Sequence, residues 1–361
     1  MITEMKTLRD IPCLRLAAGN ISSNALLFDI ETTGFSPKNA RVYLIGTLTR
    51  KEKDWHLTQW LAQTPAEEAD VLAAFCEFAS GYDTLIHFNG DAFDLPFLRE
   101  RCRLSEISSL PDTPESIDLY RRLGPLKKNL ALPAMNLKTL EAFLSFPRKD
   151  TMDGGELILL FHQFARTGEE ELKKLLLLHN RDDLLGTASL FSLFPYLDFL
   201  KGGFVPELPP QIVKEEEAFS LNISLTLHSP VPKPVVIPLK HGTAALDGSQ
   251  CRISIRGLQG TLKYFFPDYK NYYYLPLEDT AIHKSVAAYV DKAHRVPAKA
   301  STCYCKKKGL FLPGNENSQP PLFRTEAKDA AFYQECTAGF LADSVALHTY
   351  LLGCLNEVWR K

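Results

Sequence analysis

The fold of this 361-residue chain is decided by the segment Phe28-Asp29-Ile30-Glu31-Thr32-Thr33-Gly34. The segment continues a short apolar run, which predicts a strand that ends in charge and turns at the glycine. Residues i and i+2 of a strand share a face, so Asp29 and Glu31 project together. Carboxylates held side by side repel each other unless a cation lies between them. The alternative is an exposed strand end with incidental acids, but an otherwise apolar strand has little reason to pair them.

A second acidic segment is Phe88-Asn89-Gly90-Asp91-Ala92-Phe93-Asp94-Leu95-Pro96-Phe97-Leu98. The apolar run Thr84–Phe88 predicts a buried strand, and a helix is expected to begin near Asp94 after the turn at Asn89-Gly90. Taken alone, Asp94 would be interpreted as the N-cap of that helix, a position that Asp favours. Asp91 is a competing acid in the same turn.

The third segment is His179-Asn180-Arg181-Asp182-Asp183, which lies inside a long helical pattern. His179 and Asp183 are four residues apart and therefore neighbours on one face of a helix. One helix can thus present a metal-binding carboxylate with a base beside it. A solvated polar turn on a surface helix is the other interpretation, and Asp182 remains a possible substitute for Asp183.

The three segments together predict a metal-dependent site. Hard divalent cations such as Mg²⁺ prefer carboxylate oxygens and keep some of their waters. A pair of such ions about 4 Å apart activates a water and stabilises the leaving oxygen of a phosphodiester. His179 could take the proton of that water, since the unperturbed pKa of histidine is near neutral.

In their order, the strings FDIETTG, FNGDAFDLPFL and HNRDD resemble the three exonuclease motifs of the DnaQ-like (DEDD) superfamily. They are most similar to its YprB-like branch, in which the first motif is followed by a tract like Tyr43-Leu44-Ile45-Gly46. The resemblance covers roughly residues 25–195 and implies an α/β, ribonuclease H-like fold with a five-stranded mixed sheet flanked by helices. DnaQ-type histidines usually stand one residue further from the last Asp, whereas the spacing found here matches the YprB-like branch.

The resemblance also implies roles for individual residues. Asp29 would contact both of two Mg²⁺ or Mn²⁺ ions, Glu31, Asp94 and Asp183 would complete the metal shell, and His179 would be the general base. These five residues are the predicted catalytic set.

Substrate-binding residues are implied in the same way. Thr32 and Thr33 would hold the 3′-terminal nucleotide, and Asn89 and Phe93 would line the cleft. Turn hydrogen bonds for the threonines and core packing for Phe93 are the alternatives. Asp118 is interpreted as a structural or peripheral acid.

Composition divides the chain into two expected domains. Residues 1–200 form the expected exonuclease domain, and residues 201–361 a β-rich α+β accessory domain of unknown role. Residues 1–20 are expected to be an irregular or partly helical lead-in. In the second domain we expect a hairpin around Gly257–Gly260 and a helix over Glu278–Val290.

Two aromatic stretches of the second domain include or adjoin lysines, Lys263-Tyr264-Phe265-Phe266 and Tyr272-Tyr273-Tyr274. Aromatics interleaved with bases suit stacking on nucleic acid. In a β-rich domain, however, such residues more often serve as core and edge residues. The domain is therefore assigned to substrate or partner binding only as a hypothesis.

The bulk composition is that of an ordinary water-exposed globular chain. The formal net charge is −2, which gives no basic footprint for nucleic acid over the whole chain. The eight cysteines are scattered without a C-x-x-C pair, which is typical of reduced thiols. With no secretory signal and no apolar run of about 18 residues, the sequence predicts a cytoplasmic protein without a membrane partner.

The prediction is therefore a two-metal-ion 3′→5′ exonuclease that hydrolyses phosphodiester bonds at the ends of DNA or RNA. One alternative is a nucleic-acid-binding or helicase-partner protein with a vestigial nuclease site. The other is a ribonuclease H-like endonuclease, which also uses clustered acids. The sequence leaves open DNA or RNA, single strand or duplex end, oligomeric state and biological pathway.

Overall fold

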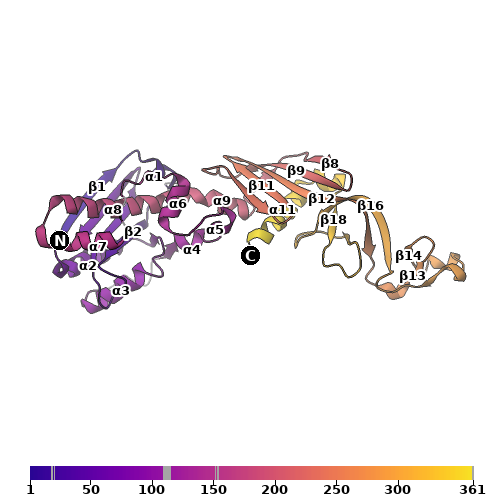
Figure 1. Cartoon of the computed structure of the whole chain (residues 1–361), viewed down its shortest axis with the longest axis horizontal. Coiled ribbons are helices and arrows are strands. Elements are labelled where there is room, and N and C mark those ends of the chain that lie inside the picture. Colours follow the sequence, from indigo (N-terminus) through magenta and orange to yellow (C-terminus); the bar gives the residue numbers. More distant parts are fainter. Residues whose placement is uncertain (18, 20, 109–114, 151, 153, 360–361) are drawn as a thin grey trace. The chain divides into compact units, whose positions relative to one another are not determined.

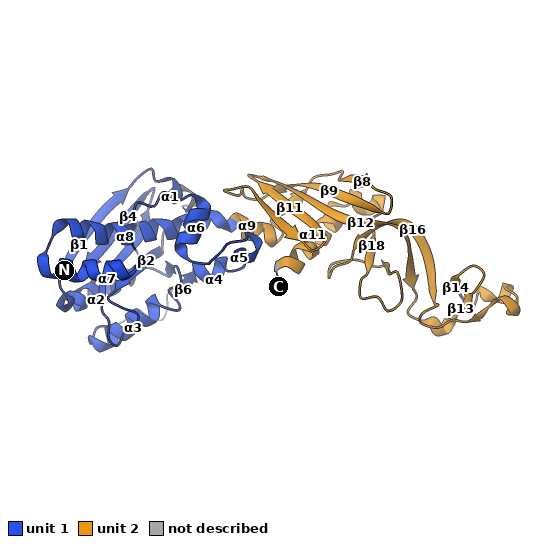
Figure 2. Cartoon of the chain, in the orientation of Figure 1, with its two compact units in different colours: residues 1–194 blue, residues 195–361 orange. Residues whose placement is uncertain are grey.

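The computed structural model describes residues 1–17, 19, 21–108, 115–150, 152 and 154–359. They form two compact units, residues 1–194 and residues 195–361 (Figure 2). The units divide at the start of helix α9 (Phe194–Leu200), whereas the sequence predicted the division after residue 200, at the end of this helix.

In the described residues, the first unit is built on a six-stranded mixed sheet with the strand order β1-β4-β3-β2-β5-β6. Strands β2, β5 and β6 are parallel to one another, and the remaining pairs are antiparallel. The strands are β1 (Ile2–Leu8), β2 (Ala25–Thr32), β3 (Val42–Lys51), β4 (Asp54–Leu61), β5 (Thr84–His87) and β6 (Glu115–Asp118). The predicted α/β mixed sheet is confirmed.

The expected irregular or partly helical lead-in at residues 1–20 is wrong over its first residues, because Ile2–Leu8 forms strand β1. This strand pairs along its whole length with β4 at the edge of the sheet and gives the sheet a sixth strand. None of its side chains is fully buried, and Met5 is 71% exposed. Because backbone pairing rather than apolar burial holds β1, its sequence lacks the apolar run that marks the central strands.

Helices cover both faces of this sheet (Figure 1). Those of the first unit are α1 (Pro12–Ala17), α2 (Glu68–Ala79), α3 (Asp94–Leu104), α4 (Leu119–Leu123), α5 (Leu126–Asn129), α6 (Leu137–Leu144), α7 (Gly154–Thr167) and α8 (Glu170–Ser189), with the 3₁₀ turns η1 (Pro65–Glu67) and η2 (Leu190–Leu193). Phe28 of β2 packs on Phe75 of α2, with ring centroids 5.4 Å apart. Asp29, the next residue, is hydrogen-bonded by Asn180 of α8. Strand alternation thus sends Phe28 into the core and Asp29 toward α8.

A buried ion pair fixes α3, the helix that begins at Asp94. Glu68 is 2% exposed and accepts hydrogen bonds from the Val42 N–H (2.9 Å) and from Nε of Arg101 (2.7 Å) on α3. Arg101 also donates to the carbonyl of Pro37 in the β2–β3 loop (2.9 Å). Removing Glu68 would leave the buried guanidinium of Arg101 without its carboxylate partner, at a cost of about 3–5 kcal/mol.

In the described residues, the second unit contains a nine-stranded and a three-stranded sheet. Strands of the larger one are β7 (Phe204–Pro206), β8 (Gln211–Lys214), β9 (Ala218–Leu227), β10 (Val235–Leu239), β11 (Gly242–Asp247), β12 (Gln250–Phe265), β16 (Tyr304–Pro313), β17 (Leu322–Phe323) and β18 (Tyr333–Glu335). The smaller one has β13 (Tyr272–Leu275), β14 (Thr280–His283) and β15 (Val296–Pro297). The remaining elements are η3 (Tyr269–Asn271), η4 (Ala287–Tyr289), η5 (Lys292–His294), α10 (Ala338–Ala342) and α11 (Ser344–Trp359).

Two expectations for this unit are wrong. The hairpin around Gly257–Gly260 is one continuous strand, β12. A Cβ on Gly257 would lie 2.3 Å from the ring of Phe219 on β9, so this glycine serves close strand packing rather than a turn. The expected helix over Glu278–Val290 contains strand β14 and the short turn η4, because Thr280–His283 pairs with β13.

Within the described ranges, we find no helix that is both long enough and apolar enough to cross a lipid bilayer.

Candidate active site

Three elements of the first unit deliver the predicted catalytic residues. Strand β2 carries Asp29 and Glu31, helix α3 begins at Asp94, and helix α8 carries His179 and Asp183. Ligand atoms of Glu31, His179 and Asp183 all lie within 4.8 Å of one another. Nε2 of His179 is 3.6 Å from a carboxylate oxygen of Glu31 and 3.6 Å from one of Asp183. Residues that are about 150 positions apart in the sequence are thus brought to one place.

Asp29 is positioned by an amide of helix α8. Nδ2 of Asn180 donates to Oδ2 of Asp29 (2.9 Å), while its Oδ1 accepts from Nε2 of Gln59 on β4 (2.9 Å). Asp29 pairs with Gly46 across β2 and β3, and Gly46 pairs with Gln59 across β3 and β4. A Cβ on Gly46 would lie 1.9 Å from Oδ1 of Asn180. The absence of a side chain at Gly46 therefore lets Asn180 lie across the sheet and reach Asp29.

The electrostatics of the acids favour a bound cation. Burial, together with the charges of Asp183, Glu31 and Asp94, raises the pKa of Asp29 well above its usual range. Burial and the charges of Asp183 and Asp94 do the same to the pKa of Glu31. Burial also raises the pKa of Asp94 to about 7, although the backbone N–H groups of Asp94 and Ile30 oppose the shift. Such carboxylates resist ionisation unless positive charge compensates them.

The residues present fit a hard divalent ion. The donor set is made of carboxylate oxygens with one imidazole, which suits Mg²⁺ or Mn²⁺. Among the described residues, no lysine or arginine forms an ion pair with Asp29, Glu31 or Asp94. These three acids could therefore hold ions together with Asp183.

A residue that the sequence analysis missed orients His179. Oδ2 of Asp150 lies 2.6 Å from Nδ1 of His179, which leaves Nε2 facing Glu31 and Asp183. Burial works against the charge of Asp150, but hydrogen bonds from the Met152 N–H and from Arg148, together with His179, lower its pKa. Asp150 is thus a carboxylate that holds the imidazole in one orientation.

Arg148 was also missed by the sequence analysis, and its positive charge lies among the acids near His179. Its guanidinium pairs with Glu141 (3.1 Å), with Asp150 (3.0 Å) and with Asp183. Burial raises the pKa of Glu141 to about 7, and the charge of Arg148 opposes that shift. Arg148 and Asp150 precede α7 in a polar loop without a recognisable motif, so only the fold reveals that they lie near His179.

The structure separates the two candidate acids at the end of the third segment. Oδ2 of Asp182 accepts the N–H groups of Lys149 (2.8 Å) and Asp150 (3.0 Å), and Asp182 is 3% exposed. Asp182 therefore shapes the loop that carries Arg148, whereas Asp183 lies beside Glu31 and His179. This geometry favours Asp183 as a ligand, and its metal-binding role stays a proposal.

The two threonines predicted to hold substrate make hydrogen bonds within their own turn. Oγ1 of Thr32 donates to the carbonyl of Gly34 (2.8 Å), and Oγ1 of Thr33 accepts from the N–H of Arg41 (2.9 Å). These contacts support the structural interpretation, while a substrate role remains a prediction.

Asn89 and Phe93 lie in the turn that leads into α3. Asn89 has a φ of 65°, a left-handed conformation that Asn tolerates better than most residues. The Phe93 ring is partly buried, with its centroid 5.4 Å from that of Phe97 and 6.5 Å from that of Phe35, which is 90% exposed. An exposed aromatic thus stands next to Phe93, and the substrate roles of Asn89 and Phe93 also remain predictions.

A second group of suitable residue types lies beside the Asn89 turn. Ligand atoms of His87, Asp91 and Asp118 also lie within 4.8 Å of one another. The Asp118 carboxylate accepts three backbone N–H groups, those of Asn89 (2.9 Å), Tyr120 (2.9 Å) and Asp91 (3.3 Å). Arg121 pairs with Asp91 at 3.0 Å. This cluster is already supplied with donors and positive charge, so it braces the turn that leads to Asp94.

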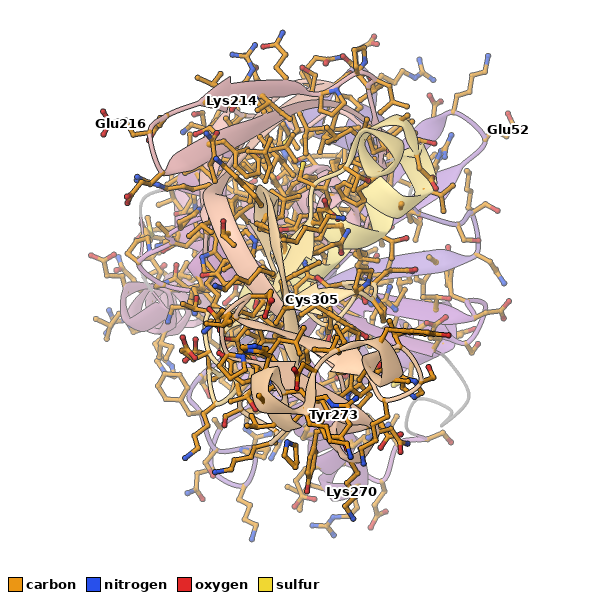
Figure 3. All side chains as sticks on the ribbon, turned by 90° about the vertical axis from the view of Figure 1, so that its right-hand side faces the viewer. Glu52, Lys214, Glu216, Lys270, Tyr273 and Cys305 are labelled. Atoms are coloured by element: carbon orange, nitrogen blue, oxygen red, sulfur yellow. The ribbon has the colours of Figure 1, made fainter. Side chains whose placement is uncertain are left out.

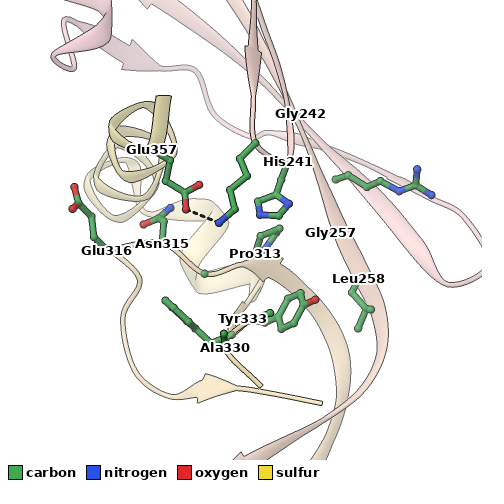
Figure 4. A pocket seen from close by; sticks show the side chains of 15 residues that line it. His241, Gly242, Gly257, Leu258, Pro313, Asn315, Glu316, Ala330, Tyr333 and Glu357 are labelled. Carbon is green, nitrogen blue, oxygen red and sulfur yellow. Dashed lines mark hydrogen bonds and ion pairs between the residues drawn. The ribbon is translucent and has the colours of Figure 1, made fainter. Parts of the chain in front are cut away.

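A cavity of about 800 Å³ lies in the second unit (Figure 4). It is bordered by the β10–β11 turn, the middle of β12, the end of β16 and helix α11. Lys240 and Glu357 on its wall pair with each other at 2.9 Å. Its lining lacks the grouped carboxylates that mark the first unit.

Comparisons with known proteins agree with this fold. Residues 26–194 match a family model described as the RNase_H superfamily. YprB of Bacillus subtilis is 30% identical over 181 residues, a match that covers 48% of this chain and 43% of that protein. The first unit therefore has a ribonuclease H-like fold and resembles YprB, as its acidic segments predicted. The match covers less than half of the length of either protein.

Two solved structures show weaker likeness. The family B DNA polymerase of Pyrobaculum calidifontis aligns with 93% of this chain and 45% of its own, with 14% identity and a TM-score of 0.42. Exonuclease I of E. coli, solved in complex with a dT13 oligonucleotide, aligns with 57% of this chain and 55% of its own, with 12% identity and a TM-score of 0.35.

Proposed function

We propose that the ribonuclease H-like unit is a metal-dependent nuclease that shortens nucleic acids from the 3′ end. The observation that carries the proposal is the grouping of Glu31 and Asp183 with a histidine that Asp150 orients, together with the charges of Asp183, Glu31 and Asp94, which help to raise the pKa of Asp29. The 3′→5′ polarity comes from the resemblance of the three acidic segments to the DEDD motifs. The family match of residues 26–194 supports the nuclease class.

Two Mg²⁺ or Mn²⁺ ions would be held by the carboxylates of Asp29, Glu31, Asp94 and Asp183. When bound, such ions lower the pKa of water and stabilise the charge on the leaving oxygen of a phosphodiester. The protein supplies the fixed positions: Asn180 holds the Asp29 carboxylate, and the Glu68–Arg101 pair holds the helix that begins at Asp94.

His179 accepts the proton of the attacking water on Nε2 in this proposal. In the proposal, the Asp150 carboxylate accepts a hydrogen bond from Nδ1–H, which leaves Nε2 to act as the base. The water oxygen forms a bond to phosphorus while the bond from phosphorus to the 3′ oxygen of the preceding nucleotide breaks, and this oxygen takes a proton from solvent. Each cycle therefore releases one nucleoside 5′-monophosphate and leaves a new 3′ hydroxyl.

Four further residues are proposed to contact the substrate. Thr32 and Thr33 follow the two acids of β2 directly, and Asn89 and Phe93 precede Asp94. All four stand close to the acids in the sequence, which supports contacts to the terminal nucleotide. The exposed ring of Phe35 beside Phe93 offers a surface on which a terminal base can stack.

The direct test is hydrolysis of labelled oligonucleotides by the purified full chain with Mn²⁺, using both DNA and RNA. We expect a 5′-labelled single strand to give a ladder of shorter products, and a 3′-labelled strand to release labelled mononucleotide at once. A preparation carrying Asp29→Asn, purified in parallel, controls for contaminating nucleases.

The other outcomes separate the alternatives. Internal cuts in a closed circular single strand would identify an endonuclease. Intact Mn²⁺ binding without any shortening would favour a vestigial nucleic-acid-binding or helicase-partner protein. Release of mononucleotide from the 5′ end would overturn the polarity.

A further inference from the structure

The second unit carries a small aromatic and basic projection, here named the tip lobe, which comprises residues 266–303. It is inserted between the paired ends of β12 and β16, where Phe265 lies opposite Tyr304. Strands β13, β14 and β15 form its sheet. Figure 3 faces this lobe, with Tyr273 and Lys270 labelled. Residues 261–310, which include the lobe and its base, contain nine Lys and Arg against four Asp and Glu, in a chain whose net charge is −2.

The acids of the tip lobe are largely occupied by donors close to them. Asp279 accepts hydrogen bonds from the hydroxyls of Tyr274 (2.6 Å) and Tyr304 and pairs with Lys306. Two further aspartates accept within their own turns, Asp268 from the Asn271 side chain (2.5 Å) and Asp291 from the Ala293 N–H (3.0 Å). These three carboxylates are thus engaged before any ligand arrives.

The lysines of the lobe have no such partners. Lys270, Lys284, Lys292 and Lys299 are exposed, and none of them pairs with a carboxylate among the described residues. Nζ of Lys284 and the guanidinium of Arg295 lie over the ring of Tyr273, at 5.6 Å and 5.0 Å from its centroid. The ring of Tyr273 thus holds two cations at the surface.

Exposed aromatic surface accompanies this charge. Tyr289 on η4 is 92% exposed, and Tyr269 on η3 is 37% exposed. Tyr272 stacks on Phe266 with ring centroids 4.6 Å apart and an interplanar angle of 16°. Tyr289, which is almost fully exposed, is therefore available to stack on a flat ligand.

We propose that the tip lobe is a binding surface for single-stranded nucleic acid, separate from the acid cluster of the first unit. Uncompensated lysines attract phosphates, and exposed tyrosines stack on unpaired bases, which are the two contacts that single strands offer together. A duplex hides the faces of its bases and would leave the tyrosines unused. The choice of ligand class draws on the proposed function, but binding by the lobe does not require hydrolysis.

The test measures binding of the full chain to a 5′-fluorescein dT20 oligonucleotide by anisotropy in EDTA, over a range of NaCl concentrations. The triple variant Lys270→Ala, Lys292→Ala, Lys299→Ala should weaken binding and reduce the slope of log K against log salt by about 2, at roughly 0.7 per phosphate contact. Tyr289→Ala should weaken binding about fivefold or more at an unchanged slope, because stacking contributes about 1–3 kcal/mol per base.

The matched control removes three exposed lysines from outside the lobe, with Lys51→Ala, Lys53→Ala and Lys214→Ala. An equal loss in this control would show that only overall charge matters and would overturn the proposal. Equal affinity of wild type for dT20 and for a blunt duplex of the same length would also overturn it, as would an absence of binding to dT20. Loss of hydrolysis in Asp29→Asn with binding intact would leave the lobe assignment standing.

Discussion

Two clusters in the first unit contain the same kinds of residue but differ in what surrounds them. Glu31, His179 and Asp183 form one, and His87, Asp91 and Asp118 form the other; in each, the ligand atoms lie within 4.8 Å of one another. In the second cluster, backbone N–H groups and Arg121 satisfy the carboxylates.

The first cluster is compensated only in part. Arg148 pairs with Asp183, while burial and neighbouring acids raise the pKa values of Asp29 and Glu31. Proximity of acids and histidine therefore does not by itself make a metal site. What distinguishes the two clusters is the supply of hydrogen-bond donors and positive charge to the carboxylate oxygens.

The largest effect should come from Asp29. We expect Asp29→Ala to abolish turnover while the unfolding midpoint stays unchanged or rises, because the substitution relieves carboxylate crowding. The measurements are turnover on a labelled single strand and a thermal melt in EDTA. Asp70→Ala, which removes an exposed acid on α2, is the matched control. Turnover within about tenfold of wild type would remove Asp29 from the metal shell.

Loss of the general base should be the next largest effect. His179→Ala should slow the chemical step about 10²–10⁴-fold in single-turnover kinetics, because the attacking water loses its proton acceptor. His162→Ala, at an exposed position on α7, should leave the rate unchanged. A smaller loss at His179 would make it a positioning residue.

Asp150→Asn tests whether the carboxylate that orients His179 matters. We expect kcat to fall about 10–100-fold with little change in KM, because the neutral amide is a weaker acceptor for Nδ1–H and can instead donate to Nδ1, which favours the tautomer with the proton on Nε2. Lys149→Ala, an exposed change in the same loop, is the control. A rise in KM at unchanged kcat would instead place Asp150 in substrate binding.

The stability of the metal-free protein should depend on pH through Asp94. The pKa of Asp94 is about 7 in the folded chain, above its value of about 3.9 in an unfolded chain. The folded state thus holds more protons, so the metal-free protein loses stability as pH rises from about 4 to about 7. Mn²⁺ replaces that proton, so its stabilising effect should be larger at pH 8 than at pH 6.

Melting temperatures with EDTA and with Mn²⁺ at the two pH values measure this effect. We expect the gain from Mn²⁺ to grow by about 2 °C or more. Asp94→Asn should remove much of the growth, and an equal gain at both pH values in wild type would show that Asp94 does not exchange a proton for the ion.

The smallest effect on metal binding is expected at the second cluster. Asp118→Ala should leave the number of bound Mn²⁺ ions per chain unchanged. It should also lower the free energy of unfolding by about 1–3 kcal/mol, because buried backbone N–H groups lose their acceptor. Equilibrium dialysis and urea unfolding measure the two quantities. Loss of an ion would mean that both clusters hold metal.

Much of the ribonuclease H-like unit could be predicted because its central strands are apolar and its acids follow strand and helix spacing. Asp29 and Glu31 follow from alternation on β2 alone, and Asp94 follows only in combination with them. The edge strand β1 could not be predicted, since pairing with β4 replaces apolar burial. In the second unit, Gly257 was interpreted as a turn residue although it makes room for the ring of Phe219.

The parts of the site that could not be predicted come from distant segments. Arg148 and Asp150 stand in a polar loop, and only tertiary packing places them against Asp183 and His179. Asn180 lies inside the predicted third segment, but its bond to Asp29 depends on a sheet and a helix meeting. The spacing of residues within one segment does not predict tertiary contacts between distant segments.

The contact between Asn180 and Asp29 requires that residue 46 has no Cβ atom. A library of single substitutions selected for activity should be depleted at Gly46 as strongly as at the acids, although Gly46 carries no chemistry of its own. A glycine opposite the first acid of the central strand can therefore be used to search for distant chains with the same fold. Such a search would also find chains that have lost the acids themselves.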